Sequence, residues 1–456
     1  MDLRSLLRRQ MRVITYGTFD LFHEGHRKLL ERAKSLGSHL IVGVTTENFD
    51  DARGKLNVQQ SLMERIQNVQ ASGLADQVII EEYEGQKIHD MQKYGVDIFA
   101  IGSDWRGSFD YLQDYCQVIY LDRTEGISST LLRKENLGVV RLGIVGAGRI
   151  ANRFMTESLF VSGVHIEGVC SRTHESASSF KNKHQLKYAT TNYADLLENV
   201  DAVYLASPHE THFEYAEAAI RRGIHVLCEK PLTLTAAEAV ALFDLAREMN
   251  VVLVEALKTA FSPGFQRMVA VARSGSIGDI RSVDATFTKL EKGDLRELQG
   301  GAGGSISELA SYPVLAIVKL LGGSYRSLTC YSHIPRTSEV DLFSRIDLLY
   351  PHALASARVG LGVKCEGDLV VGGTEGYIYV PAPWWKTEYF EARFEDPTRN
   401  KRYYYKFDGD GLRYEIAEFI SLINGGQIET YKMRASESIA IARIIETARQ
   451  EAVVFV

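Results

Sequence analysis

The sequence predicts an α/β protein with three domains: two with parallel sheets, followed by an α+β domain whose sheet is largely antiparallel. Three observations support this prediction. Short β-rich runs alternate with helical patterns over the first two thirds of the 456 residues, which is typical of parallel sheets. A second strand–turn–helix unit begins near residue 140. The last third then changes to alternating strands and a closing helix from Tyr414 onward.

The expected elements set the domain limits. The first sheet is predicted to contain strands at residues 12–19, 39–46 and 96–104, with an amphipathic helix at 26–37. The last domain is predicted to contain strands within 344–361, 376–383 and 402–407. The stretch "LRKENLG" is polar and ends at Gly138, so it marks a boundary. We therefore predict domains at 11–136, 141–262 and 263–456, with a linker at 137–140.

Composition narrows the class of protein. Hydrophobic residues make up 45% and charged residues 24% of the chain, as in globular proteins that are soluble. The net charge of −6 argues against a nucleic-acid partner. No apolar run approaches the length of about 20 residues that a membrane span needs. The five cysteines are scattered and form no CxxC pair, so we expect reduced thiols and a cytoplasmic location.

The stretch "GTFDLFHEGH", residues 17–26, predicts a phosphate site. His23 and His26 are three residues apart, whereas the zinc-protease pattern needs two histidines four apart. A strand ends near Thr18 and a helix begins near Gly25, and the start of a helix attracts anions. A pair of surface histidines or a structural zinc site remains an alternative.

A second stretch supports the phosphate interpretation. "RTEGISST", residues 123–130, follows a strand and places an arginine, a glycine and four hydroxyl-bearing residues at another helix start. Together with "VITYGTFDLFHEGH", "KLLERAKSLG" and "IGSDW", it resembles the HxGH nucleotidyltransferases, and among them the glycerol-3-phosphate cytidylyltransferase family. The resemblance covers roughly residues 11–135.

The resemblance implies direct cytidylyl transfer from CTP, with Mg²⁺ accompanying CTP and no metal held by the protein. A phosphate oxygen of the acceptor attacks the α-phosphate, and pyrophosphate leaves. Asp20 either takes part or ties the loop by hydrogen bonds. The residues implied in catalysis are His23, His26 and Arg123. Those implied in binding CTP are Thr18, Phe19, Lys55, Arg65, Asp104, Arg123, Ser128, Ser129 and Thr130.

The stretch "GIVGAGRIA", residues 143–151, predicts a Rossmann dinucleotide-binding domain. Its G-x-G-x-x-A pattern directly follows a strand and opens a helix, the context in which this motif has meaning. Ser171 and Arg172 stand at the end of the next strand, where an NAD enzyme usually has a carboxylate, so NADP is favoured over NAD. The predicted cofactor contacts are Gly146, Gly148, Arg149, Ile150, Ser171, Arg172, Ser207, His212, Glu229 and Lys230. A plain strand–helix turn is the alternative, and His212 could equally be a loop histidine.

The segment from about residue 140 to the end resembles the Gfo/Idh/MocA oxidoreductase family. The resemblance rests on "HVLCEKPLT", "VEALKTAFSPGF" and the closing helix. It implies that Lys230 contacts substrate and assists proton transfer. "ELASYP" replaces the family pattern D-x-G-x-H/Y, with Glu308 and Tyr312 as further substrate residues and Ala310 in place of glycine. Lys230 and Tyr312 are the residues implied in catalysis, with Tyr312 as the acid–base partner of the substrate hydroxyl.

We therefore predict a bifunctional enzyme. It would reduce a ketose phosphate to a polyol phosphate with NAD(P)H and convert that product to a CDP-polyol for a surface polysaccharide or a teichoic-acid-like polymer. Its expected partners are these small molecules and further copies of itself in a homo-oligomer. Two alternatives stay open. The second half could be a non-catalytic dinucleotide-binding module, or it could act on the CDP-linked product.

Overall fold

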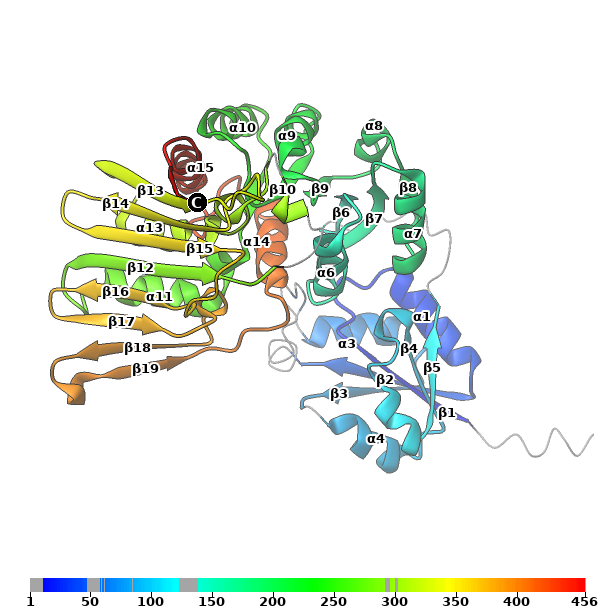
Figure 1. Cartoon of the computed structure of the whole chain (residues 1–456). Coiled ribbons are helices and arrows are strands. Elements are labelled where there is room, and N and C mark those ends of the chain that lie inside the picture. Colours follow the sequence, from blue (N-terminus) through cyan, green and yellow to red (C-terminus); the bar gives the residue numbers. More distant parts are fainter. Residues whose placement is uncertain are drawn as a thin grey trace, which may run out of the picture. The chain divides into compact units, whose positions relative to one another are not determined.

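The computed structural model describes residues 11–46, 58, 60, 62–83, 85–122, 138–291, 296–299 and 302–455. The chain divides into two compact units (Figure 1). The first consists of residues 1–141 with 158–191, and the second of residues 142–157 with 192–456. Within the described ranges, no helix is both long and apolar enough to cross a membrane.

The first unit contains a five-stranded parallel sheet with the order β3-β2-β1-β4-β5. Its strands are β1 Arg12–Gly17, β2 His39–Thr45, β3 Gln77–Glu81, β4 Ile98–Gly102 and β5 Gln117–Leu121. Its helices are α1 Glu24–Ser35, α3 Leu62–Ala71 and α4 Gln86–Tyr94, with the 3₁₀ turns η1 Ser103–Trp105 and η2 Asp110–Asp114. This unit also contains β7 Val164–Cys170, α7 His174–His184 and β8 Tyr188–Thr190.

Alternation along the strands gives the first sheet two apolar faces. Val13 packs in one core with α1 and α3, and the neighbouring Ile14 packs in another with Met91 of α4. Successive strand side chains point to opposite faces, so helices can cover both sides (Figure 1). The carboxyl ends of β1 and β4 lie side by side where the strand order reverses, which is where α/β sheets bind ligands.

A second parallel sheet has the order β11-β10-β9-β6-β7-β8, the strand order of dinucleotide-binding domains. Its remaining strands are β6 Val140–Val145, β9 Ala202–Leu205, β10 His225–Glu229 and β11 Leu253–Ala256. The associated helices are α6 Arg149–Ser158, α8 Tyr193–Leu197, η3 His209–Thr211, α9 His212–Ile220 and α10 Ala236–Glu248.

The rest of the second unit is built on a nine-stranded sheet, order β19-β18-β17-β16-β12-β15-β14-β13-β20. Its pairs are antiparallel except β12 with β15 and β13 with β20. The strands are β12 Ile280–Thr288, β13 Ser327–His333, β14 Phe343–Leu349, β15 Leu354–Gly360, β16 Leu369–Gly373, β17 Gly376–Val380, β18 Tyr389–Phe394, β19 Lys401–Tyr404 and β20 Val453–Phe455. The fold class predicted from the sequence is confirmed.

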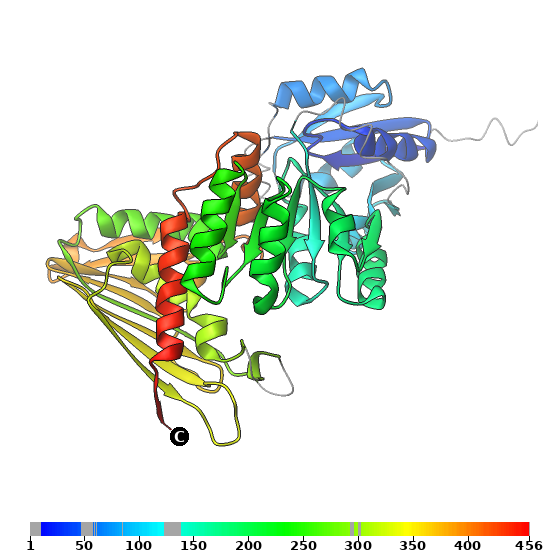
Figure 2. The same ribbon diagram turned by 90° about the horizontal axis from the view of Figure 1, so that it is seen from above.

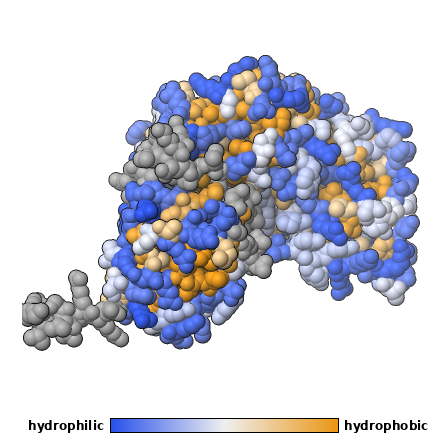
Figure 3. Space-filling model, turned by 180° about the vertical axis from the view of Figure 1, so that it is seen from behind, coloured by the Kyte–Doolittle hydropathy of each residue, from blue (hydrophilic) through white to orange (hydrophobic). Residues whose placement is uncertain are grey.

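This part of the second unit also contains helices and 3₁₀ turns. They are η4 Lys258–Phe261, α11 Pro263–Arg273, η5 Arg296–Leu298, α12 Ser305–Leu309, α13 Ser311–Leu321, η6 Trp384–Lys386, η7 Pro397–Arg399, α14 Leu412–Asn424 and α15 Ala435–Gln450. The single closing helix expected from Tyr414 is two helices, because "GGQ" after Asn424 interrupts the helical pattern. Helix α15 packs against α10 and α13 (Figure 2). On the face in Figure 3, apolar residues form patches separated by polar side chains.

Two candidate active sites

The first candidate site lies where β1 ends and α1 begins. His23 is the N-cap of α1, and its Nδ1 accepts a hydrogen bond from the backbone N–H of Gly25 at 3.0 Å. In a neutral ring the proton is then on Nε2, which can act as a donor. A Cβ on residue 25 would lie 2.8 Å from Cε1 of His23, so glycine is what allows the imidazole to take this position.

His26 lies one helical turn further on and stacks on His23. The ring centroids are 3.9 Å apart with an interplanar angle of 20°. Phe19 meets His26 edge to face at 5.4 Å and is itself 1% exposed. The i, i+3 spacing therefore orders two imidazoles side by side at the start of the helix.

The loop that carries these histidines is strained and held by hydrogen bonds. Phe19 and Leu21 have φ values of +53° and +46°, which non-glycine residues rarely adopt. The backbone N–H of Leu21 donates to Oε1 of Gln60, and the N–H of Gln60 donates to Oδ1 of Asp20. Asp20 thus ties the loop, the structural one of its two predicted roles.

Arg65 of α3 contacts this loop and is fully buried. Its guanidinium donates to the carbonyl oxygens of Thr18 at 2.9 Å, Thr45 at 2.8 Å and Gln60 at 3.0 Å. The side chain therefore joins the ends of β1 and β2, and a CTP contact by Arg65 stays a prediction. Asp104 is exposed in η1, after β4. Five predicted residues lie outside the described part: Lys55, Arg123, Ser128, Ser129 and Thr130.

A buried polar cluster on the other face of this sheet was not predicted. The hydroxyl of Tyr16 donates to Asp90 at 2.8 Å, and Lys87 pairs with Glu81 while its ammonium lies 4.6 Å from the centre of the Tyr16 ring. Burial, and then Asp90, raises the pKa of Tyr16, so it remains a hydrogen-bond donor. In the sequence, the charged residues of α4 look like those of an exposed helical face, so no pattern marks them as buried.

The second candidate site begins with the glycine turn between β6 and α6. Gly146 has φ +99°, and a Cβ there would lie 2.5 Å from the carbonyl oxygen of Ala206. Helix α6 starts directly after Gly148, so its first N–H groups can meet a pyrophosphate. These residues fit a dinucleotide. Arg149 forms an ion pair with Glu297 at 2.6 Å, Ile150 is in the first turn, and their cofactor contacts stay predictions.

The end of β7 carries no carboxylate in position for a ribose. Ser171 follows the strand, and its hydroxyl lies 3.3 Å from that of Ser176, while Arg172 is exposed. Glu167, earlier in the strand, is 1% exposed and pairs with Lys187 at 2.6 Å. The described residues 170–173, at the end of β7 and just after it, include no carboxylate, which is what a cofactor with a 2′-phosphate requires there.

His212 is fully buried and ties two loops together. Its Nδ1 lies 2.8 Å from the carbonyl oxygen of Pro231, and its Nε2 lies 3.0 Å from that of Ser207. These contacts fix the turn after β9 against the EKP segment. They favour the ordering role, and direct cofactor contacts of Ser207 and His212 stay predictions.

Lys230 of "HVLCEKPLT" and Glu308 of "ELASYP" are in contact, although 78 residues separate them in the sequence. The ammonium of Lys230 donates to the carbonyl oxygen of Glu308 at 2.9 Å and lies 3.8 Å from its carboxylate. The other carboxylate oxygen is 3.9 Å from Nδ1 of His209, a residue that was not predicted. The three side chains are 14%, 9% and 6% exposed, so the Lys230 charge acts in a poorly hydrated site.

Acidic side chains influence the predicted tyrosine, Tyr312. Burial, followed by Glu229 and Glu415, raises the pKa of Tyr312. Burial also raises the pKa of Glu229, which accepts a 2.5 Å hydrogen bond from Tyr204, and that of Glu415. Burial lowers the pKa of Lys258, while Glu415 opposes that shift. This cluster was not predicted, apart from Glu229 and Tyr312.

An aromatic wall, formed by Phe287 and Trp385, adjoins Tyr312. Phe287 meets Tyr312 edge to face at 5.0 Å and stacks on Trp385 at 3.7 Å. The carbonyl oxygen of Trp385 accepts from the hydroxyl of Thr259, which fixes η6. Half-buried aromatic rings next to a tyrosine can stack on a ring in a substrate, such as a sugar or a base.

Glu255 provides a test of this buried interior. Burial raises its pKa from 4.5 to about 7. Between these pH values the folded chain holds more protons than the unfolded chain, so the free energy of unfolding should fall as pH rises, by up to about 3 kcal/mol. Glu255→Gln keeps an acceptor for the N–H of Leu232 but cannot titrate, so urea unfolding from pH 5 to 8 should lose this decline. An unchanged pH profile would contradict the assignment.

Family models match three separate stretches of the chain. Residues 14–135 match the family described as cytidylyltransferase-like. Residues 140–257 match the oxidoreductase family with an NAD-binding Rossmann fold, and residues 265–379 match the GFO/IDH/MocA C-terminal domain.

Individual relatives match the two parts separately. The glycerol-3-phosphate cytidylyltransferase of Bacillus spizizenii is 52% identical over 124 residues, 27% of this chain and 95% of the relative. A D-xylose 1-dehydrogenase (NADP(+)) of Haloferax volcanii is 29% identical over 326 residues, 68% of this chain and 96% of the relative. The 3-ketoreductase KijD10 of Actinomadura kijaniata, solved with TDP-benzene and NADP, shares the fold with a TM-score of 0.61 and 24% identity, covering 70% of this chain and 100% of that one.

Proposed function

Because the chain belongs to the cytidylyltransferase-like family over residues 14–135 and to the GFO/IDH/MocA oxidoreductase family over residues 140–257 and 265–379, we propose that it catalyses two consecutive steps. It reduces a ketose phosphate to a polyol phosphate with NADPH, and it transfers a cytidylyl group from CTP to that polyol phosphate. The product is a CDP-polyol, a precursor for a surface polysaccharide or a teichoic-acid-like polymer.

In the cytidylyl transfer, a phosphate oxygen of the polyol phosphate attacks the α-phosphorus of CTP, and the bond to the β-phosphate oxygen breaks to release pyrophosphate. The chain's part is positioning and charge stabilisation. His23 offers Nε2–H because its Nδ1 is engaged by Gly25, and the 3.9 Å stack fixes His26 beside it. The start of α1 adds backbone N–H groups. Mg²⁺ enters with CTP as part of the substrate.

In the reduction, the bound nicotinamide supplies the hydride. Lys230 holds a proton for the carbonyl oxygen of the ketose, and the Glu308 carboxylate at 3.8 Å orients the ammonium. Tyr312 stays protonated because its pKa is raised, so it donates a hydrogen bond to a substrate oxygen. The meeting of Lys230 with Glu308 is the observation that carries the proposal, since it places a partly buried ammonium beside a carboxylate, as a proton donor to a substrate requires.

A substrate panel tests the proposal. The full chain is given CTP, Mg²⁺ and a series of polyol phosphates, with pyrophosphate release as the readout. It is then given NADPH and the matching ketose phosphates, with absorbance of NADPH as the readout. We expect one carbon skeleton to be accepted in both assays. Acceptance of unrelated skeletons by the two halves would overturn the two-step pathway.

The aromatic wall favours one second candidate, reduction or oxidation of the nucleotide-linked product. Phe287 and Trp385 next to Tyr312 would stack on a sugar ring or a base. This candidate would be selected if the chain reduces NADP⁺ with a CDP-polyol but oxidises NADPH with no ketose phosphate.

The preference for NADP can be tested at Arg172. NADPH should bind at least about tenfold more tightly than NADH, since a guanidinium pairs with the 2′-phosphate. Arg172→Ala should remove this difference and hardly affect NADH. Arg247→Ala, on the exposed face of α10, serves as the control. Fluorescence titration that gives equal affinities in the unmodified chain would reject the preference.

A further inference from the structure

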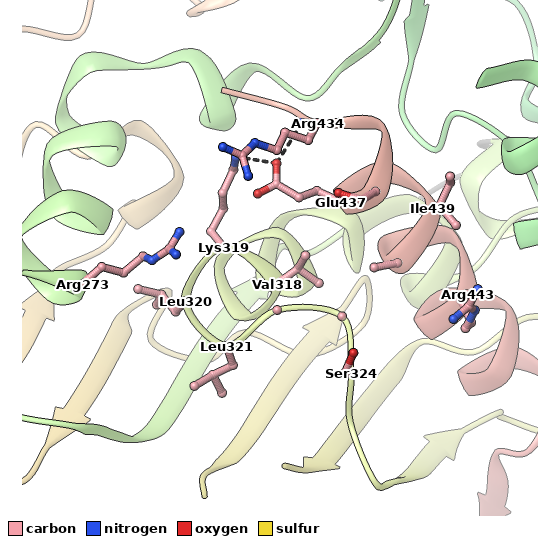
Figure 4. Close-up of a pocket in the computed structure, with 14 residues that line it drawn as sticks. Arg273, Val318, Lys319, Leu320, Leu321, Ser324, Arg434, Glu437, Ile439 and Arg443 are labelled. Atoms are coloured by element: carbon pink, nitrogen blue, oxygen red, sulfur yellow. Dashed lines mark hydrogen bonds and ion pairs between the residues drawn. The ribbon is translucent and has the colours of Figure 1, made fainter. Parts of the chain in front are cut away.

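A basic cavity lies on the second unit, between the end of α13 and the start of α15 (Figure 4). Its volume is about 610 Å³, within the range of small-molecule sites. It is lined by four cationic residues and one acidic residue: Arg273, Lys319, Arg434, Arg443 and Glu437. None of them belongs to either candidate active site.

The backbone explains why the cavity exists. Helix α13 ends at Leu321, and Gly322 follows with φ +82° and closes the helix by donating to the carbonyl oxygen of Val318. Gly323 then approaches α15 so closely that a Cβ there would lie 2.6 Å from Cβ of Ala440. Two consecutive glycines leave the floor without side chains, next to the apolar Leu320 and Ile439.

The only carboxylate in the lining is already engaged. Oε2 of Glu437 accepts from the ammonium of Lys319 at 2.6 Å and from the backbone N–H of Arg434 at 2.9 Å. The Lys319 side chain is 5% exposed. This pair is neutral as a unit, so the surplus charge of the cavity comes from the three arginines.

Three arginines line the cavity around the Lys319–Glu437 pair. Burial lowers the pKa of Lys319, Glu437 opposes that shift, and Arg434 and Arg273 add smaller lowering contributions. In Figure 4, Arg273 lies on the α11 side of Lys319 and Arg443 on the α15 side. Within the described ranges, no hydrogen bond or ion pair engages the guanidinium of Arg273 or Arg443. Like charges gathered on a chain of net charge −6 create a local field that an anion would relieve.

The chemistry of the lining identifies the kind of anion. Guanidinium groups form paired hydrogen bonds with phosphate oxygens, and the apolar floor can cover an uncharged part of the ligand. The start of α15 does not provide the anion site, since the backbone N–H of Ala435 already donates to Glu429. We propose that this cavity binds a phosphorylated small molecule, and that it does so independently of the two reactions proposed above.

Hydrogen exchange of the full chain can locate the binding. The probes are inorganic phosphate, pyrophosphate, CDP and glycerol 3-phosphate, each compared with KCl at equal ionic strength. His26→Ala should be used as the background, because it weakens the CTP site. We expect at least one probe to slow exchange in residues 318–324 and 434–443, and the pattern across probes tells a free phosphate from an organic one. Protection by none of them, or equally by KCl, would overturn the proposal.

Arginine variants test whether the protection comes from this cavity. Removing Arg273 and Arg443 together should weaken the affinity of the protecting probe by about tenfold or more, since hydrogen bonds to charged groups are strong. Arg449→Ala, on the same helix but outside the lining, is the matched control and should have no effect. Equal affinity in the double variant would reject the assignment. A change of sedimentation in the double variant without any anion effect would show instead that the face contacts a second copy.

Discussion

Replacing His26 with alanine is expected to lower the rate of pyrophosphate release from CTP by about 10² to 10³, with the fold intact. The reason is the position of the ring, stacked at 3.9 Å on His23 at the start of α1. Removing one preorganised donor from a site of developing charge costs about 2.7–4 kcal/mol in comparable enzymes. Initial rates at saturating CTP and acceptor measure the effect.

Packing must be separated from chemistry in this experiment, because His26 also contacts Phe19 and Phe22. His26→Gln keeps an N–H donor of similar reach and should retain more activity than His26→Ala at equal thermal stability. His89→Ala, on the exposed side of α4, controls for loss of a histidine elsewhere in the unit. Near-normal turnover in a well-folded His26→Ala chain would reject the proposed role.

The parts of the fold that could be predicted were those with a local pattern. Both glycine-containing turns follow an apolar strand and open a helix, so a single stretch of sequence indicates strand, turn and helix together. The two helices after Leu412 were predicted as one. A Gly-Gly pair can end a helix or be tolerated within one, and only packing decides which.

Site residues that belong to a recognised motif could be predicted from the sequence. Residues whose role arises only from burial were missed. Lys230 and Glu308 were both expected to contact substrate, and the fold brings them together. Glu255 and Glu415 read as ordinary acids in the sequence, because the desolvation that raises their pKa arises only from tertiary packing.

Arg65 shows a signal that was available but not used. Its contact with CTP stays a prediction, and the structure adds three backbone carbonyl partners for its guanidinium. Arg65 and Val69 are four residues apart and are the buried residues of α3. A basic residue in step with the apolar face of a helix indicates a buried structural arginine as readily as a phosphate ligand.

Lys230→Ala is expected to stop NADPH oxidation with a ketose phosphate and to leave CTP turnover on the matching polyol phosphate unchanged. Loss of a positioned proton donor costs about 10² to 10⁴ in rate. Lys230→Arg sharpens the test, because arginine keeps the charge near Glu308 but does not give up its proton at neutral pH. It should lower kcat far more than it changes KM. Lys401→Ala, exposed on β19, is the control.

The same pair of variants tests whether the two halves work in sequence. Unmodified chain supplied with ketose phosphate, NADPH and CTP should accumulate a CDP-polyol, and Lys230→Ala or His26→Ala alone should block it. Mixing the two variants should restore the product, because the polyol phosphate can diffuse from one chain to the other. If CTP turnover is brisk while no ketose phosphate in a broad panel supports NADPH oxidation, the consecutive pathway is wrong. The Lys230 site must then act on another substrate, and the aromatic wall beside Tyr312 makes the nucleotide-linked product the first to try.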